Sequence, residues 1–143
     1  MLRDDPESGL AALGFRERLL DGRRAMAHLI HVWHELNGWS HRVLPAFVEC
    51  LELGKVHNSQ ISNLRNGKLC SPGPEVFLAL AQANAVLYSG LDPFRARLLK
   101  LHPELLTLLT ESGIPLLNSD GKPIGGGDFF EIFVGLSPLP ASY

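Results

Sequence analysis

One stretch constrains this chain more than any other: Val56 to Lys68, which reads VHNSQISNLRNGK. Its apolar residues Ile61 and Leu64 are spaced three apart, as on one face of a helix. Gly67 is typical of the residue that ends a helix. The stretch therefore predicts a short helix from Asn58 to Asn66, with one apolar face and one face of amides and hydroxyls. Amide side chains on an exposed helix can donate and accept in pairs, as the reading of base edges requires.

The same stretch resembles the recognition helix of the phage-repressor-like (XRE, lambda-repressor-like) helix-turn-helix family. The resemblance lies in the order of an Ile-Ser pair, an apolar residue, a Gly-Lys pair, a proline and an apolar helix. It covers about Ala25 to Val86 and implies an all-α fold, a lambda-repressor-like helix-turn-helix bundle with extra N- and C-terminal helices. The matching residues are Val56, Ile61, Ser62, Leu64, Gly67, Lys68, Pro72 or Pro74, Glu75, Val76, Leu78, Leu80 and Ala81.

Two features depart from the pattern of that family. The interval from Leu44 to Ile61 is 17 residues, longer than in the family by more than a helical turn. Either the first helix of the motif or the turn after it must therefore be longer. Arg65 stands where many family members have glutamate. An arginine there reaches a phosphate, pairs within the protein, or is an ordinary surface residue.

The formal net charge of −2 is unusual for a DNA-binding protein, because affinity for DNA depends on neutralising phosphates. The charge is unevenly distributed. Residues 40–70 carry four basic and two acidic side chains, whereas residues 1–39 and 71–143 each carry more acidic than basic ones. The segment that contains the predicted helix is the only positive part of the chain, which favours a nucleic-acid-binding face there.

The sequence has no apolar run as long as the roughly 18 residues of a membrane span, and its first residues, MLRDD, are too acidic for a signal peptide. Cys50 and Cys70 are too few for a disulfide framework, so we expect both to be reduced in a cytoplasmic protein. No glycine-rich phosphate loop or GxSxG motif is present. We expect a protein that is not an enzyme, needs no cofactor and does not bind membranes.

Ahead of the central stretch, apolar spacing predicts two helices. The first covers about Ser8 to Leu20, and Asp21 with Gly22 is expected to break it. The second covers about Arg23 to Asn37. Asp21 is placed to cap this second helix.

The second of these helices carries His28, His31 and His34 at steps of three. Imidazoles on adjacent turns could bind a metal ion such as zinc. A straight helix, however, turns the first and last of them away from a common point. We favour polar residues flanking an apolar stripe, and expect no metal site.

Ser40 is a good N-cap for the next helix, expected from about His41 to Leu53. Pro45 fits this helix only within its first turn, since a proline further in removes a helix hydrogen bond. This would be the first helix of the helix-turn-helix, crossing the DNA backbone. Gly54 with Lys55 forms the expected turn.

The C-terminal part predicts further helices. Glu75 to Tyr88 is a strongly apolar one, and Asp92 with Pro93 starts another that runs to about Leu101. Pro103 either kinks that helix or starts a new one ending near Ser112. The leucine-rich face of this region packs in the core or forms a dimer contact.

The segment from residue 114 onward differs in composition from the helices before it. Residues 114–127 hold turn residues, and Asp128 with Glu131 predicts a capping box that opens a short helix, Phe129 to Val134. The same residues are aromatic and β-branched, so a strand is the alternative. In either form they are too apolar to be free, and dock on the helices or on a second subunit.

These observations divide the chain into an N-terminal helical extension (1–22), a helix-turn-helix DNA-binding-like domain (23–91) and a C-terminal helical extension (92–143) able to serve in dimerisation. The expected function is a sequence-specific transcriptional regulator that binds double-stranded DNA as a homodimer, because one short helix reads too few base pairs alone. The alternative is a protein–protein interaction module that keeps the fold without binding DNA and uses the Leu- and Phe-rich C-terminal surfaces. The residues expected to read bases are Asn58, Ser59, Gln60 and Asn63, and those expected to contact phosphates are Ser40, His41, Arg65, Asn66 and Lys68.

Overall fold

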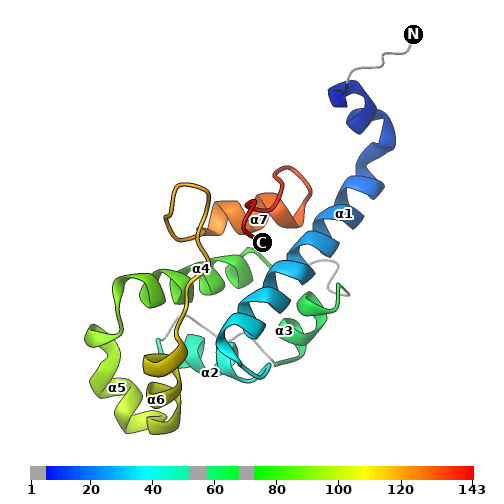
Figure 1. Cartoon of the computed structure of the whole chain (residues 1–143). Coiled ribbons are helices and arrows are strands. Elements are labelled where there is room, and N and C mark those ends of the chain that lie inside the picture. The colour runs from blue at the N-terminus through cyan, green and yellow to red at the C-terminus, as the bar shows by residue number, and fades with distance from the viewer. Residues whose placement is uncertain (1–5, 52–57, 68–72) are drawn as a thin grey trace.

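The structure, a computed structural model, describes residues 6–51, 58–67 and 73–143 (Figure 1). The secondary structure of these residues is helical, and the expected all-α fold is confirmed. The only pairing of extended backbone in this part of the chain is a single antiparallel bridge between Leu117 and Pro123. The helices are α1 (Pro6–Asn37), α2 (Val43–Cys50), α3 (Asn58–Arg65), α4 (Pro74–Ser89), the 3-10 turn η1 (Asp92–Phe94), α5 (Arg95–Leu101), α6 (Pro103–Ser112) and α7 (Gly126–Phe133).

The longest helix, α1, runs straight through Gly22, so the predicted break there is wrong. Gly22 is buried, and a Cβ on it would collide with the backbone of Phe133 and Gly135. This glycine therefore allows the end of α7 to approach α1 closely, rather than ending a helix. The irregularity in α1 lies instead at Gly14, whose φ of 85° and ψ of 176° are not helical.

Helix α2 begins at Val43, without a side-chain cap, so the prediction of Ser40 as N-cap is wrong. With Ser40 as the cap, the fifth helical residue would be Pro45, which has no N–H to donate to the carbonyl of His41 and would clash with it. The observed start makes Pro45 the third helical residue, within the first turn as predicted. The helix ends at Cys50 rather than Leu53, so the long interval before α3 does not come from a longer first helix.

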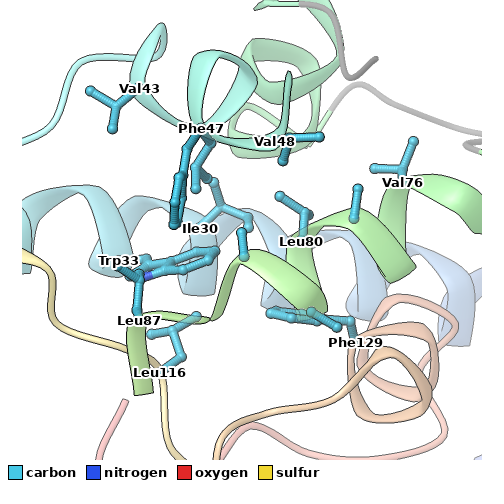
Figure 2. Close-up of a cluster of buried hydrophobic side chains, with 14 of the residues drawn as sticks. Ile30, Trp33, Val43, Phe47, Val48, Val76, Leu80, Leu87, Leu116 and Phe129 are labelled. Atoms are coloured by element: carbon cyan, nitrogen blue, oxygen red, sulfur yellow. The ribbon is translucent and has the colours of Figure 1, made fainter. Parts of the chain in front are cut away.

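One hydrophobic core joins residues from every α-helix, α1 to α7, and from the loop before α7; Figure 2 shows part of it. Trp33 lies at its centre, with its ring centroid 5.7 Å from that of Trp39 and 6.4 Å from that of Phe129. The core therefore draws on segments from both ends of the chain. Its fully buried members include Met26, Leu29, Ile30, Leu44, Phe47, Leu64, Leu80, Leu98 and Leu116.

The leucine-rich face of α5 and α6 packs mainly into this core. Pro103 starts a new helix, which decides between the two alternatives for that residue. Leu98, Leu105 and Leu109 are buried, whereas Leu101 is exposed.

Residues 129–133 are helical and Val134 is the C-cap, which excludes the strand alternative. Helix α7 begins at Gly126, earlier than predicted, and packs on α1 and α4. Asp128 is its third residue rather than its N-cap, and its Oδ2 accepts a hydrogen bond from the backbone N–H of Gly125 at 3.0 Å. Phe129 and Phe133 are buried, while Phe130 is exposed.

Two buried asparagines hold the loop between α6 and α7. The amide of Asn84, on α4, donates to the carbonyls of Leu116 (2.8 Å) and Ile124 (3.2 Å) and accepts from the N–H of Leu116 (2.7 Å). Asn37, at the end of α1, donates to the carbonyl of Ile114 (3.1 Å) and accepts from its N–H (2.6 Å). Loop backbone that would otherwise be buried without partners is thereby satisfied.

Candidate nucleic-acid interface

Helix α3 lies against α1 and α2, close to the predicted bounds (Figure 1). Leu64 is 1 % exposed, so this residue of the predicted apolar side faces the core, whereas the side chain of Ile61 lies outside the described part of the structure. Gly67 follows with a φ of 72°, the left-handed conformation expected after a helix end. A Cβ on Gly67 would lie 3.9 Å from the Cβ of Ala27, so this end of α3 rests on α1. The position of α3 is therefore fixed from its apolar side.

The residues predicted to read bases lie on α3. Asn63 is exposed, and Gln60 is half-buried. Asn58 and Ser59 belong to the same helix, but their side chains lie outside the described part of the structure. Asn63 is thus the predicted base-reading side chain that is open to solvent.

The residues predicted to contact phosphates come from two elements. Asn66 is exposed just after α3, and Ser40 is exposed in the turn before α2. The hydroxyl oxygen of Ser40 accepts a hydrogen bond from the N–H of Arg42 at 3.4 Å. Lys68 and the expected turn at Gly54 lie outside the described residues.

Arg65 and His41 are both half-buried, and each is near enough to His34, in the last turn of α1, to lower its pKa. The Nδ1 atom of His34 donates to the carbonyl of Ile30 at 2.7 Å. Burial lowers the pKa of His34 below 6.5; the hydrogen bond to Ile30 opposes this, and the charges of Arg65, His31 and His41 add to it. Two predicted phosphate contacts from separate elements are thus placed within electrostatic reach of one residue.

The second ring nitrogen of His34, Nε2, is buried and has no hydrogen-bond partner among the described residues. The indole nitrogen of Trp39 is in the same situation, and the two rings meet edge to face with centroids 6.2 Å apart. Nδ1 carries the proton of the hydrogen bond to Ile30, and burial of Nε2 without a partner, together with the lowered pKa, favours a lone pair on Nε2. His34 is therefore a neutral imidazole that links α1 to the turn before α2.

The other two histidines of α1 have different surroundings. His28 donates from Nε2 to the backbone carbonyl of Tyr143 at 3.0 Å, and His31 lies 3.0 Å from the carboxylate of Glu35. The three rings do not converge. No group of three potential ligands in the described part of the chain is placed to hold a metal ion.

A second surface was not anticipated from the sequence. A groove of about 240 Å³ lies between α1 and α7, and most of its lining is apolar. The even spacing of apolar residues in α1 gave no sign of it, because the groove depends on the position of α7, more than 100 residues later. The lining residues are Phe15, Arg18, Leu19, Phe130, Val134 and Leu136.

The sequence analysis also did not identify the two buried asparagines that hold the loop between α6 and α7. Asn84 interrupts an apolar helix in the run AQANA, and Asn37 ends another apolar helix. An amide inside an apolar face signals a buried hydrogen-bond partner. The sequence does not show which backbone groups are the partners.

A model of the family described as "Domain of unknown function (DUF8644)" matches residues 16–135, so the chain belongs to that family. The match begins in α1 and ends after α7, and so includes α3 together with the C-terminal helices. Neither a curated protein nor a solved structure matches the sequence. No helix in the described part of the chain is long and apolar enough to cross a membrane.

Proposed function

We propose that this member of a family of unknown function is a sequence-specific DNA-binding transcriptional regulator, which acts as a homodimer and reads DNA with α3. One observation carries the proposal. Helix α3 presents the exposed amide of Asn63, while the neighbouring buried Leu64 fixes the helix to the core. Side chains held in this way can keep the geometry on which paired hydrogen bonds to a base depend.

The order and packing of the helices support a lambda-repressor-like arrangement. Helix α2 packs against α3 and α4, and α1 packs against α3. In a helix-turn-helix the second helix enters the major groove while the first crosses the backbone. Here α3 and α2 take these roles, and the extra residues of this chain fall between Cys50 and Asn58.

The proposed division of labour follows the exposure of the side chains. Asn63 reads a base, together with Gln60 and the sequence-predicted Asn58 and Ser59. Arg65 and His41 contact phosphates, with Ser40, Asn66 and Lys68, and set the register of the helix on the duplex. The positive charge of Arg65 and the polar turn before α2 lie near the same end of α1, which suits a backbone strand running past both.

Selection from random duplexes, followed by a salt titration of the enriched sequence, tests the proposal. Asn63→Ala is expected to lose roughly 1–3 kcal/mol of discrimination at one base pair. Gln82→Ala, which removes an exposed amide from α4, is the matched control and should leave binding unchanged. If no sequence is enriched by the folded protein, or if both variants behave alike, α3 does not read bases.

The phosphate contacts have their own test. Arg65→Gln should weaken binding to all sequences similarly and reduce the slope of log affinity against log salt by about 1. Arg95→Gln makes the same charge change on α5 and serves as its control. Equal losses for the two variants would show a general charge effect and not a contact at α3.

The second candidate function is a protein–protein interaction module. The groove between α1 and α7 favours it, because Phe15 beside the groove is 78 % exposed. A chain that selects no duplex, while Phe15 and Phe130 determine its association with protein, would support this function instead.

A further inference from the structure

Two of the six asparagines of the chain, Asn37 and Asn66, stand directly before a glycine. Such a pair is chemically labile, because the backbone nitrogen of the glycine can attack the side-chain carbonyl carbon of the asparagine. Glycine has no Cβ to obstruct this approach, and its backbone turns into it easily. Each of the other asparagines precedes a residue that has a side chain.

The backbone has the same conformation at both pairs, since each glycine lies just after a helix. The φ angle is 66° at Gly38 and 72° at Gly67. The N–H of Gly38 donates to the carbonyl of Glu35 at 3.3 Å, and that of Gly67 donates to the carbonyl of Leu64 at 3.1 Å. The helix end therefore restrains the two attacking nitrogens alike, and a difference in reactivity must come from the asparagine side chains.

The side chain of Asn37 is buried and fully engaged. It is 5 % exposed, and its Nδ2 atom donates to the carbonyls of Trp33 (3.0 Å) and Ile114 (3.1 Å). Its Oδ1 atom accepts from the N–H of Ile114 at 2.6 Å. Rotation of this amide toward Gly38 would break all three hydrogen bonds in a buried place, which is costly.

The side chain of Asn66 is in the opposite situation. It is exposed, and no hydrogen bond joins its amide to another residue of the described ranges. The amide can rotate toward the nitrogen of Gly67 without losing a partner in the protein, and water reaches it directly. One of two chemically identical pairs is thus open to reaction and the other is closed.

We propose that Asn66 is a site of spontaneous deamidation, at which a neutral amide becomes a carboxylate while Asn37 stays intact. The nitrogen of Gly67 loses its proton to solvent base and bonds to Cγ of Asn66. The bond from Cγ to Nδ2 breaks, and the nitrogen leaves as ammonia with a proton from water. Water then adds to one of the two carbonyls of the resulting ring and reopens it, as aspartate or as its isomer with the chain running through the side-chain carbon.

The reaction would place a negative charge just after the C-terminal end of α3. That position is unfavourable for a carboxylate, because the helix carbonyls already make this end negative. A consequence for DNA rests on the proposed function, in which Asn66 contacts a phosphate. The amide can donate a hydrogen bond to a phosphate, whereas a carboxylate cannot and repels it. The affinity for DNA would therefore decline as the protein ages.

The modification is tested without DNA. The full chain is incubated in mildly alkaline water enriched in heavy oxygen, and its peptides are mapped by mass spectrometry. The peptide with Asn66 should exchange an amide for a carboxyl that holds one solvent oxygen. Its rate should exceed that at Asn37 by at least roughly tenfold, because Asn37 must first lose its hydrogen bonds.

The unfolded chain is the matched control, since in urea the fold no longer distinguishes the two pairs and their rates should converge. Higher pH should accelerate the reaction at Asn66, because the attacking nitrogen must lose its proton. The proposal is overturned if Asn66 stays intact in the folded protein while it reacts in urea. It is also overturned if Asn37 reacts as fast as Asn66 in the folded protein.

The consequence for DNA has a separate test on a selected duplex. Asn66→Asp should weaken binding by roughly fivefold at physiological salt, the contribution of about one neutralised phosphate. Gln82→Glu makes the same exchange of amide for carboxylate on α4 and should bind as the parent protein does. Ageing should weaken the parent protein but not Asn66→Gln, whose longer side chain closes the ring far more slowly.

The two proposals fail in different ways. Deamidation at Asn66 in a chain that selects no duplex would overturn the proposed function and support the modification site. Selection of a duplex by a chain whose Asn66 stays intact would overturn the modification site alone. Equal binding by Asn66→Asp and Gln82→Glu would overturn the effect of the new charge on DNA.

Discussion

The two halves of α1 share one helix but have opposite surroundings. In the second half, the apolar stripe is fully buried beneath α2, α4 and α7, and Trp33 lies at the centre of the core (Figure 2). In the first half, Phe15 is exposed, and Arg18 and Leu19 line a groove with residues of α7 and the segment that follows it. Both halves have apolar residues at helical spacing, so periodicity does not distinguish them. What covers a helix is decided by segments far away in the chain.

The largest difference between the two halves is expected when one aromatic ring is removed from each and the free energies of unfolding are compared. Trp33→Ala should lower the free energy of unfolding by roughly 3–5 kcal/mol, because it leaves a large cavity. It also removes the indole N–H that donates to the carbonyl of Ile114 at 3.0 Å. Phe15→Ala should change it by less than about 0.5 kcal/mol in the monomer. Urea unfolding at a concentration where the protein is monomeric measures both. Similar losses would mean that the first half is also packed.

A smaller loss of unfolding free energy is expected from a substitution at Asn37, the last residue of α1. Asn37→Ala removes the acceptor of the N–H of Ile114 and should cost roughly 1–3 kcal/mol. The carbonyl of Ile114 keeps one donor, the indole of Trp33, which limits the loss. The control is Gln82→Ala, an exposed amide, whose unfolding midpoint in urea should match the parent protein. Equal midpoints for all three proteins would show that the loop is held by other contacts.

The next prediction concerns the effect on stability of a substitution at Gly22, which lies between the two halves of α1. Gly22→Ala should destabilise by about 1 kcal/mol, since overpacking against Phe133 and Gly135 outweighs the gain in helix propensity. Gly127→Ala is the matched control, because no atom lies within 4 Å of its added Cβ. That variant should be neutral or more stable by up to about 1 kcal/mol. Thermal unfolding of the pair measures the difference, and stabilisation by Gly22→Ala would contradict the close approach.

Gly22 also shows how far the sequence determines the fold. Local rules succeeded where the cause is local: Pro45 must lie in a first turn, and Gly67 takes a positive φ after α3. At Gly22 the same rules predict a break, because glycine is a weak helix former. The reason for this glycine is instead a contact with residues 133–135, which no local pattern contains.

The features of the candidate site also divide into those that follow from local sequence and those that depend on tertiary contacts. The bounds of α3 and the burial of Leu64 could be predicted, since both follow from spacing within one short stretch. The approach of Arg65 and His41 to His34 could not, because it depends on how α3 and the turn before α2 pack on α1. The groove beside Phe15 could not be predicted either. In both places, tertiary contacts between segments that are distant in the sequence position the side chains.

The smallest predicted effect is a pH dependence that originates in the buried half of α1. The pKa of His34 is lowered in the folded protein, chiefly by burial, while Arg65, His31 and His41 act in the same direction. Above pH 6.5 the ring is neutral in both states; below it the unfolded chain binds a proton that the folded protein refuses. The free energy of unfolding should therefore fall as the pH drops below about 6.5, by at most about 1.4 kcal/mol per pH unit, until the lowered pKa is reached.

His34→Gln removes the titrating group, so the measurable result is the slope and not the absolute stability of the variant. Urea unfolding from about pH 7.5 to pH 5 should show a shallower decline for His34→Gln than for the parent protein. A protonated ring would place a second N–H at Nε2, where the described residues offer no acceptor. Identical slopes would show that the folded protein accommodates the proton after all, and that the buried half of α1 is less closed than its contacts indicate.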